Sequence, residues 1–123
     1  MKIILPWPPK ELSPNARVHW SVRARIAKNY RNECMVLTRN SGAKIDWHGD
    51  IHLFIDFYPP DRRRYDDDNL SSRLKSGRDG VADALGVDDK RFRAHPYLRD
   101  DVRPGGEVVL RIATTEILGV EVI

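Results

Sequence analysis

The alternation of hydrophobic and polar positions along the chain predicts two helices and several short strands. Apolar residues recur every three or four positions over 20–40 and 68–85, which is the spacing of one helical face. Strict alternation over 51–58 predicts a strand with one buried face. Shorter strands are expected at 2–5, 95–99 and 107–115, the last two as a hairpin around the turn 104–106. The order β-α-β-α-β-β predicts an α+β fold, a two-layer domain with two helices packed on a small sheet.

Individual residues in the two helices have expected roles. Cys34 falls on the apolar face of the first helix and is expected in the core. Gly77 and Gly80 lie inside the second helix, where each costs about 1 kcal/mol relative to alanine, so we expect them to allow close packing. Asp68 or Asn69 is expected to cap the free N–H groups at the start of that helix.

Length and composition predict one soluble domain over residues 1–123. The chain is 41% hydrophobic, enough for a single core without disulfides, and Cys34 has no second cysteine to pair with. No stretch approaches the ~20 apolar residues of a membrane span. Pro6 interrupts the N-terminus before a signal peptide could form. These features predict a cytoplasmic protein without membrane partners, and the histidines lack the spacing of a zinc site.

The net charge of +3 hides an uneven distribution along the chain. Residues 1–48 contain nine lysines and arginines against three acidic residues, whereas residues 61–101 contain ten of each. Basic residues of the first segment, Arg17 and Arg23 among them, are candidates for phosphate contacts on a nucleic acid. The alternative is that they only solvate an exposed helix face.

The segment 61–70 has the greatest density of charge, with three arginines and three aspartates within seven residues. In extended chain, Asp66 and Asp68 point to the same side, and paired carboxylates of this kind suit a hard divalent ion such as Mg²⁺. Such an ion supports phosphodiester hydrolysis, and the run 62–64 (Arg62, Arg63, Arg64) could hold the phosphate oxygens. The alternative is a cluster that only caps a helix.

A second acidic pair, Asp88 and Asp89, follows the second predicted helix after a short turn. A helix of about 18 residues is ~27 Å long, so Asp89 approaches Asp66 only if the chain folds back. Spacing alone leaves this open.

Three segments together resemble the RusA family of Holliday junction resolvases. They are Leu5-Pro6-Trp7-Pro8-Pro9, the run from Asp61 to Leu70, and Asp83-Ala84-Leu85 followed by Asp88-Asp89, and they span nearly the whole chain in the family's order. The resemblance implies a small homodimeric, Mg²⁺-dependent endonuclease that makes paired nicks in four-way DNA junctions. It also implies a bacterial or phage gene, since prophages often encode members of the family.

The resemblance implies roles for particular residues. The family's essential carboxylates fall on Asp66, Asp68 and Asp89, which would form the metal site, while Asp67 would point away. Asn15 matches a family asparagine near the DNA.

The family's lysine, one helical turn beyond the second carboxylate, is replaced here by Ser72. At 100° per residue, Lys75 projects from the same helix face as Asp68, whereas Arg73 lies well off that face. Lys75 is therefore the expected catalytic cation, and Arg73 is the alternative.

The resulting prediction is a crossover junction endodeoxyribonuclease that acts in DNA recombination and repair, with Mg²⁺ or alternatively Mn²⁺ and without an organic cofactor. The alternatives are a junction-binding protein that does not cleave and a nuclease for flaps or other branched DNA. A two-fold symmetric dimer suits two matched cuts. Gly77 and the apolar tail 117–123 are candidate dimer surfaces, and the alternative for the tail is a last strand. The expected DNA-binding residues are Asn15, Arg17, Arg23, Arg62, Arg63, Arg64, Asn69 and Arg73.

Overall fold

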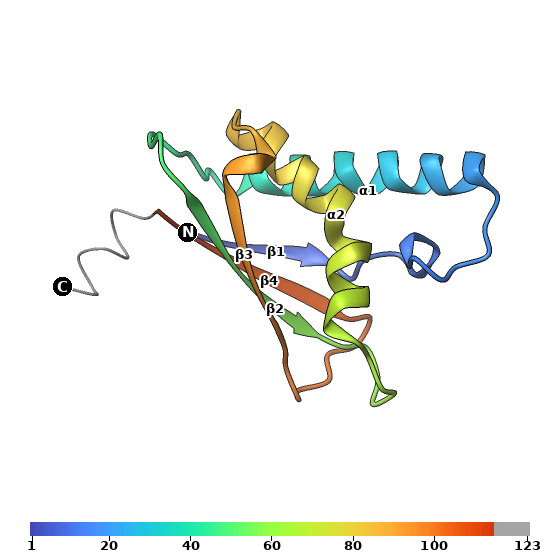
Figure 1. The fold of residues 1–123 in the computed structure, drawn as a ribbon. Coiled ribbons are helices and arrows are strands. Elements are labelled where there is room, and N and C mark those ends of the chain that lie inside the picture. Colours follow the sequence, from blue (N-terminus) through green and yellow to red (C-terminus); the bar gives the residue numbers. More distant parts are fainter. Residues whose placement is uncertain (115–123) are drawn as a thin grey trace.

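The computed structural model describes residues 1–114, which form a four-stranded mixed sheet and two long helices (Figure 1). The predicted α+β class and the predicted order of helices and strands are confirmed. The elements are β1 (Lys2–Pro6), a 3₁₀ turn (Lys10–Leu12), α1 (Trp20–Asn40), β2 (Ile51–Tyr58), α2 (Asp67–Leu85), a 3₁₀ turn (Asp89–Arg91), β3 (Phe92–Leu98) and β4 (Glu107–Thr114).

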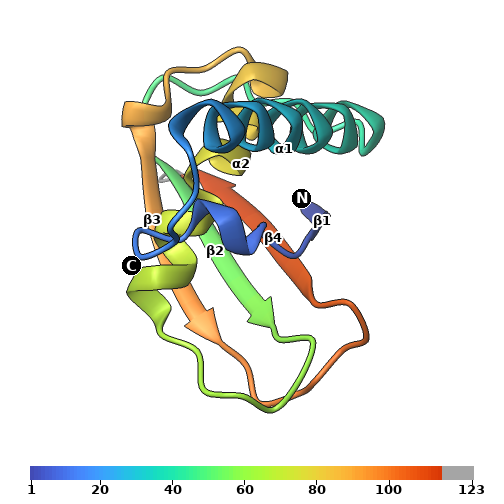
Figure 2. The ribbon, with the colours of Figure 1, turned by 90° about the vertical axis from the view of Figure 1, so that its right-hand side faces the viewer.

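The sheet has the order β1-β4-β2-β3, and the four strands lie side by side in Figure 2. β4 is antiparallel to both β1 and β2, whereas β3 is parallel to β2. The predicted hairpin of 95–99 with 107–115 is therefore wrong, because β2 lies between β3 and β4. The helix α2 carries the chain back so that β3 runs beside β2 in the same direction, as parallel strands require.

Alternation along the strands divides the sheet into a covered and an open face. On β2, Leu53, Ile55 and Phe57 are buried toward the helices, and neighbouring strands place apolar residues at the matching positions. The helices contribute buried residues to the same core, and both lie on this side of the sheet. Their buried residues include Tyr30, Cys34, Leu70, Leu74 and Val81.

The helices cross at two glycines, which confirms their expected packing role. A Cβ at Gly77 would lie 2.6 Å from the ring of Tyr30, and one at Gly80 would lie 2.1 Å from the carbonyl oxygen of Arg31. Gly77 is buried against α1 of the same chain, so it is not a dimer surface. The other candidate dimer surface, 117–123, lies outside the described residues.

Cys34 is buried at this crossing, as predicted. Burial raises the pKa of its thiol to about 12, because the thiolate would lose its hydration. The hydroxyl of the neighbouring Tyr30 donates a hydrogen bond to the carbonyl of Pro6 over 2.7 Å, which ties α1 to the end of β1.

Candidate functional site

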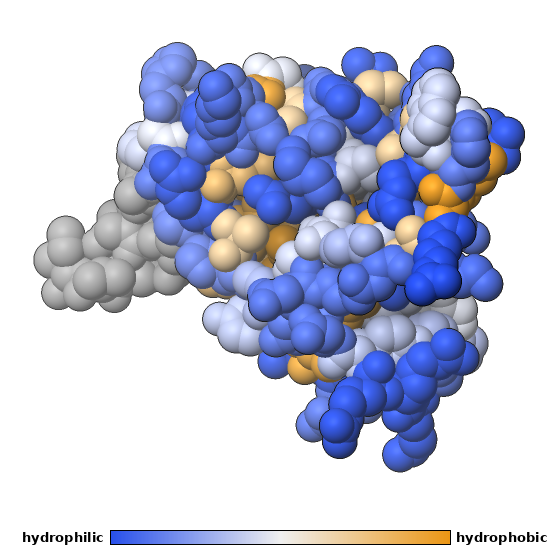
Figure 3. Space-filling model, turned by 45° about the vertical axis from the view of Figure 1, so that its right-hand side comes forward, coloured by the Kyte–Doolittle hydropathy of each residue, from blue (hydrophilic) through white to orange (hydrophobic). Residues whose placement is uncertain are grey.

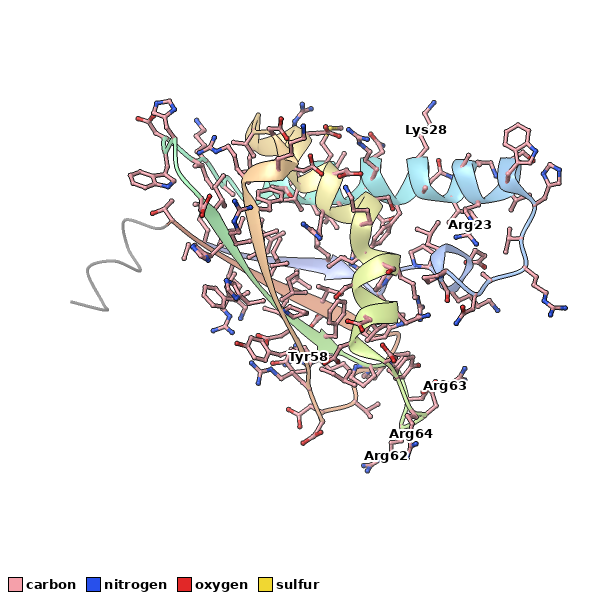
Figure 4. All side chains as sticks on the ribbon, in the orientation of Figure 1. Arg23, Lys28, Tyr58, Arg62, Arg63 and Arg64 are labelled. Atoms are coloured by element: carbon pink, nitrogen blue, oxygen red, sulfur yellow. The ribbon has the colours of Figure 1, made fainter. Side chains whose placement is uncertain are left out.

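A pocket of about 560 Å³ lies beside the N-terminal end of α2, where the loop 59–66 meets the loop after the first prolines. Figure 4 shows Arg62, Arg63 and Arg64 projecting from the lower end of the molecule, and Figure 3 shows strongly hydrophilic side chains gathered there. The pocket is lined by Pro14, Asn15, Arg63, Arg64, Tyr65, Asp66, Asp68, Asn69, Ser72 and Arg73.

Asp66 is the cap of α2, so the expectation that Asp68 or Asn69 caps this helix is wrong. One oxygen of the Asp66 carboxylate accepts hydrogen bonds from the backbone N–H groups of Asp68 (2.8 Å) and Asn69 (3.1 Å). The helix therefore begins at Asp67, one residue before the predicted start. Asp68 lines the pocket, and Asp67 is not among its lining residues.

Two residues predicted to contact DNA hold the loop that carries Asn15, Arg23 from α1 and Asn69 from α2. The guanidinium of Arg23 donates to the carbonyl oxygens of Ser13 (3.2 Å) and Ala16 (3.0 Å), and the amide of Asn69 donates to the hydroxyl of Ser13 over 2.8 Å. Arg23 thus positions the loop, as its place between α1 and that loop in Figure 4 also shows. No sequence signal pointed to Ser13, because its partners lie ten and 56 positions away.

Arg73 is the buried cation of the pocket. Its side chain is 8% exposed, one terminal nitrogen donates to the carbonyl of Pro8 over 2.7 Å, and the guanidinium carbon lies 5.8 Å from the centre of the Trp7 ring. Its Nε has no hydrogen-bond partner, and no ion pair to Arg73 occurs within the described chain. Burial lowers the pKa of this guanidinium, since the charge is desolvated without a matching anion.

Lys75 lies further along α2 with two carboxylates. Its ammonium donates to Asp79 over 2.7 Å and to Asp89 over 2.9 Å. The chain therefore does fold back after α2, because the turn at Gly86, with φ of 68°, sends the next residues alongside the helix. The return stops short of the pocket, since seven residues of helix separate Lys75 from Asp68 by about 10 Å.

The ion pair between Lys75 and Asp89 gives a prediction that can be measured by titration. The hydrogen bond from Lys75 lowers the pKa of the Asp89 carboxyl, so the pair is complete at neutral pH and is lost as the pH falls through that depressed value. In Lys75→Ala we expect the pKa of Asp89 to rise toward its ordinary value in a carboxyl NMR titration. Asp83, whose pKa is lowered by Arg31, is the internal control and should not move. An unchanged Asp89 would contradict the pairing.

The structure brings most of the predicted site together but leaves Asp89 and Lys75 apart from it. Asp66 and Asp68 share the pocket with several predicted DNA-binding residues, and Arg62 lines an adjoining pocket with Arg99. Arg17 is exposed on the chain before α1, and Lys28 points away from the pocket in Figure 4. Within residues 1–114, no group of three or more His, Cys, Asp or Glu side chains is placed to hold a metal ion. The residues found in the pocket are Asn15, Arg63, Arg64, Asn69 and Arg73 with the two aspartates.

Sequence reasoning missed a buried aspartate on the opposite face of the sheet. Asp56 is 4% exposed and both of its oxygens are paired, one with Arg99 (2.6 Å) and the other with Arg111 (3.1 Å). The available signal was that Asp56 is the one carboxylate in the predicted strand 51–58, at a position that alternation assigns to the face away from the core. Its partners, 43 and 55 positions away, could not be read from the sequence.

No helix among residues 1–114 is both long enough and apolar enough to cross a membrane.

The chain is similar to a bacterial protein of uncharacterized function. No family model matches the chain. An uncharacterized protein of Xylella fastidiosa (strain Temecula1 / ATCC 700964) is 50% identical over 113 residues, a match that covers 89% of this chain and 74% of the relative.

Proposed function

The chain belongs to the same family as the Xylella fastidiosa protein, whose function is uncharacterized, and we propose that it is a Mg²⁺-dependent endonuclease for four-way DNA junctions. The proposal places it among the RusA-like resolvases and includes a homodimer with two matched sites. The supporting observation is the pocket at the start of α2, where Asp66 and Asp68 lie among arginines.

The chemistry of this pocket suits a phosphodiester bound beside a divalent ion. Mg²⁺ is commonly held by one or two carboxylates, with water and substrate phosphate completing its ligands, so Asp66 and Asp68 meet this requirement. When bound, the ion would supply an activated water and offset the charge on the phosphate. Asp66 has one oxygen engaged as the helix cap, which fixes the direction of its carboxylate.

The cations of the pocket have separate tasks in this proposal. Arg63 and Arg64 are exposed and reach outward, so they contact phosphates of the incoming DNA. Arg73 is held from behind by Pro8 and lacks a carboxylate partner, so a phosphate oxygen at the pocket wall would offset its buried charge. In the proposal, Arg73 rather than Lys75 lies beside the scissile phosphate, because Lys75 is already paired with Asp79 and Asp89.

A second candidate function is junction binding without cleavage. It is favoured by the separation of Asp89 from Asp66 and by the capping role of Asp66, since a cap alone explains an aspartate at that position.

The test is an assay of the purified chain on a labelled four-way junction, a flap and a linear duplex, each with Mg²⁺ and with EDTA. We expect symmetric paired nicks in the junction that require Mg²⁺, and no cutting of the linear duplex. Tight junction binding without nicks under Mg²⁺ or Mn²⁺ would establish the binding protein instead. Preferential cutting of the flap would overturn the assignment of substrate.

A further inference from the structure

The sheet face opposite the helices combines aromatic rings with cations. Outward positions of β2 hold His52, Phe54 and Tyr58, and the edge strand β3 adds His95 and Tyr97. Tyr97 is 46% exposed. Around these rings lie five cations, which are Lys2, Arg93, Arg99, Arg103 and Arg111.

The rings are arranged as a platform. Nδ1 of His52 and Nε2 of His95 are 2.9 Å apart, the ring centres are 5.1 Å apart and the planes differ by 15°. A hydrogen bond of that length between ring nitrogens accounts for the distance between the two ring centres, so the imidazoles lie edge to edge in nearly the same plane. Phe54 lies 4.8 Å from His95 with planes 18° apart, a separation at which the rings overlap face to face.

Guanidinium groups extend this platform toward the lower end of the sheet. The guanidinium carbon of Arg99 lies 5.1 Å from the centre of the Tyr97 ring, and that of Arg103 lies 3.5 Å from the centre of Tyr58. Arg99 also lines the pocket that contains Arg63 and Arg64, which in turn line the pocket at the start of α2. A cationic surface therefore continues from the sheet face to the proposed site.

The charge of the face indicates the kind of partner. Asp50, Asp56 and Glu107 form ion pairs with the arginines of this face, and Asp100 and Asp101 lie beside Arg99 and Arg103. A polyanion with flat groups between its charges complements both the cations and the rings.

We propose that this face binds single-stranded DNA, with bases stacked on the rings of β2 and β3 and phosphates held by the surrounding arginines. The binding is separate from cleavage, and only the choice of DNA over RNA rests on the proposed function. In a branched substrate, the face would hold an unpaired strand that passes over Arg62, Arg63 and Arg64.

The test measures the anisotropy of a labelled oligothymidylate in EDTA, so that cleavage plays no part. Tyr97→Ala, and the double variant with His95→Ala, should weaken binding by about fivefold or more, because each stacked base contributes roughly 1–3 kcal/mol. Trp20→Ala is the matched control, since Trp20 is 76% exposed at the start of α1, and it should change affinity by less than about twofold. A 5-bromodeoxyuridine oligonucleotide should crosslink under ultraviolet light to peptides of β2 or β3.

Equal affinities for Tyr97→Ala, Trp20→Ala and the unaltered chain would overturn the proposal, as would tighter binding of an oligouridylate RNA. A dimer that becomes a monomer in Tyr97→Ala, measured by light scattering, would show that a second copy occupies the face. Circular dichroism of each variant confirms that it is folded. If the unaltered chain nicks junctions but does not bind oligothymidylate, the nuclease proposal stands and this one fails. If it binds oligothymidylate but does not nick junctions, this proposal stands and the nuclease proposal fails.

Discussion

Asp68→Asn should abolish Mg²⁺-dependent nicking of a four-way junction while leaving the fold and junction binding intact. Asp68 lines the pocket, and its side chain has no hydrogen bond or ion pair within the described residues, so its carboxylate is free for an ion. Replacing one of two carboxylate ligands removes several kcal/mol of charge stabilisation, which corresponds to a rate loss on the order of 10²-fold or more. Binding should be retained or improved, because a negative charge near phosphate is removed.

Asp67→Asn is the matched control for this change. Asp67 lies in the same helical turn, so both variants lose the same favourable interaction with the helix dipole, about 0.3–1 kcal/mol. Of Asp67 and Asp68, only Asp68 lines the pocket. Nicking should therefore be nearly normal in Asp67→Asn, and equal losses in both variants would show that the acidic cluster acts only through the helix. Single-turnover cleavage rates, with junction affinity measured in EDTA, make the comparison.

Asp66 requires a different substitution because it has two tasks. Removing its side chain also removes the helix cap, which costs about 0.5–2 kcal/mol. Asp66→Asn keeps an oxygen that can accept from the N–H groups of Asp68 and Asn69 but lacks the charge. It therefore separates the ligand role from the capping role, which alanine would not do.

The two long helices could be predicted closely because their signal is local. The spacing of apolar residues over 20–40 matches α1, and the prediction 68–85 differs from α2 by one residue, since Asp66 rather than a later residue caps the helix. The sheet order could not be predicted, because alternation shows which face of a strand is buried but not which strand lies beside it. β3 starts at Phe92, earlier than expected, and its pairing with β2 depends on where α2 delivers the chain.

The candidate site was predictable in composition but not in arrangement. The cluster over 61–70 gave Asp66, Asp68 and the arginines, because residues so close in sequence must lie close in space. The assignment of Lys75 used the direction of a helix position and ignored the reach of the side chain. Arg73 enters the pocket although its position is off the Asp68 face, while Lys75 is held by Asp79 and by Asp89 from the returning chain.

Gly80→Ala should lower the free energy of unfolding by at least about 3 kcal/mol, the upper part of the range for overpacking. The added methyl group would lie 2.1 Å from the carbonyl oxygen of Arg31 and 3.0 Å from the backbone nitrogen of Met35. Both are backbone atoms of α1, which cannot rotate away, so the helices must separate. The gain in helix propensity, about 1 kcal/mol, is too small to offset this strain.

Gly77→Ala is the comparison for this prediction, because its methyl group would meet the ring of Tyr30 and the sulfur of Cys34 rather than backbone. Side chains can shift by a few tenths of an ångström, so we expect a smaller loss of stability in urea unfolding. A Gly80→Ala variant as stable as the unaltered chain would show that the two helices are not in close contact at Gly80.

The crossing also sets the inclination of α2, which carries Asp68 at one end and Lys75 near its middle. If the two helices separate moderately and the chain stays folded, the start of α2 should move and the hydrogen bond from Asn69 to Ser13 should weaken. Junction nicking should then also be slower, because this hydrogen bond joins α2 to the loop at the pocket.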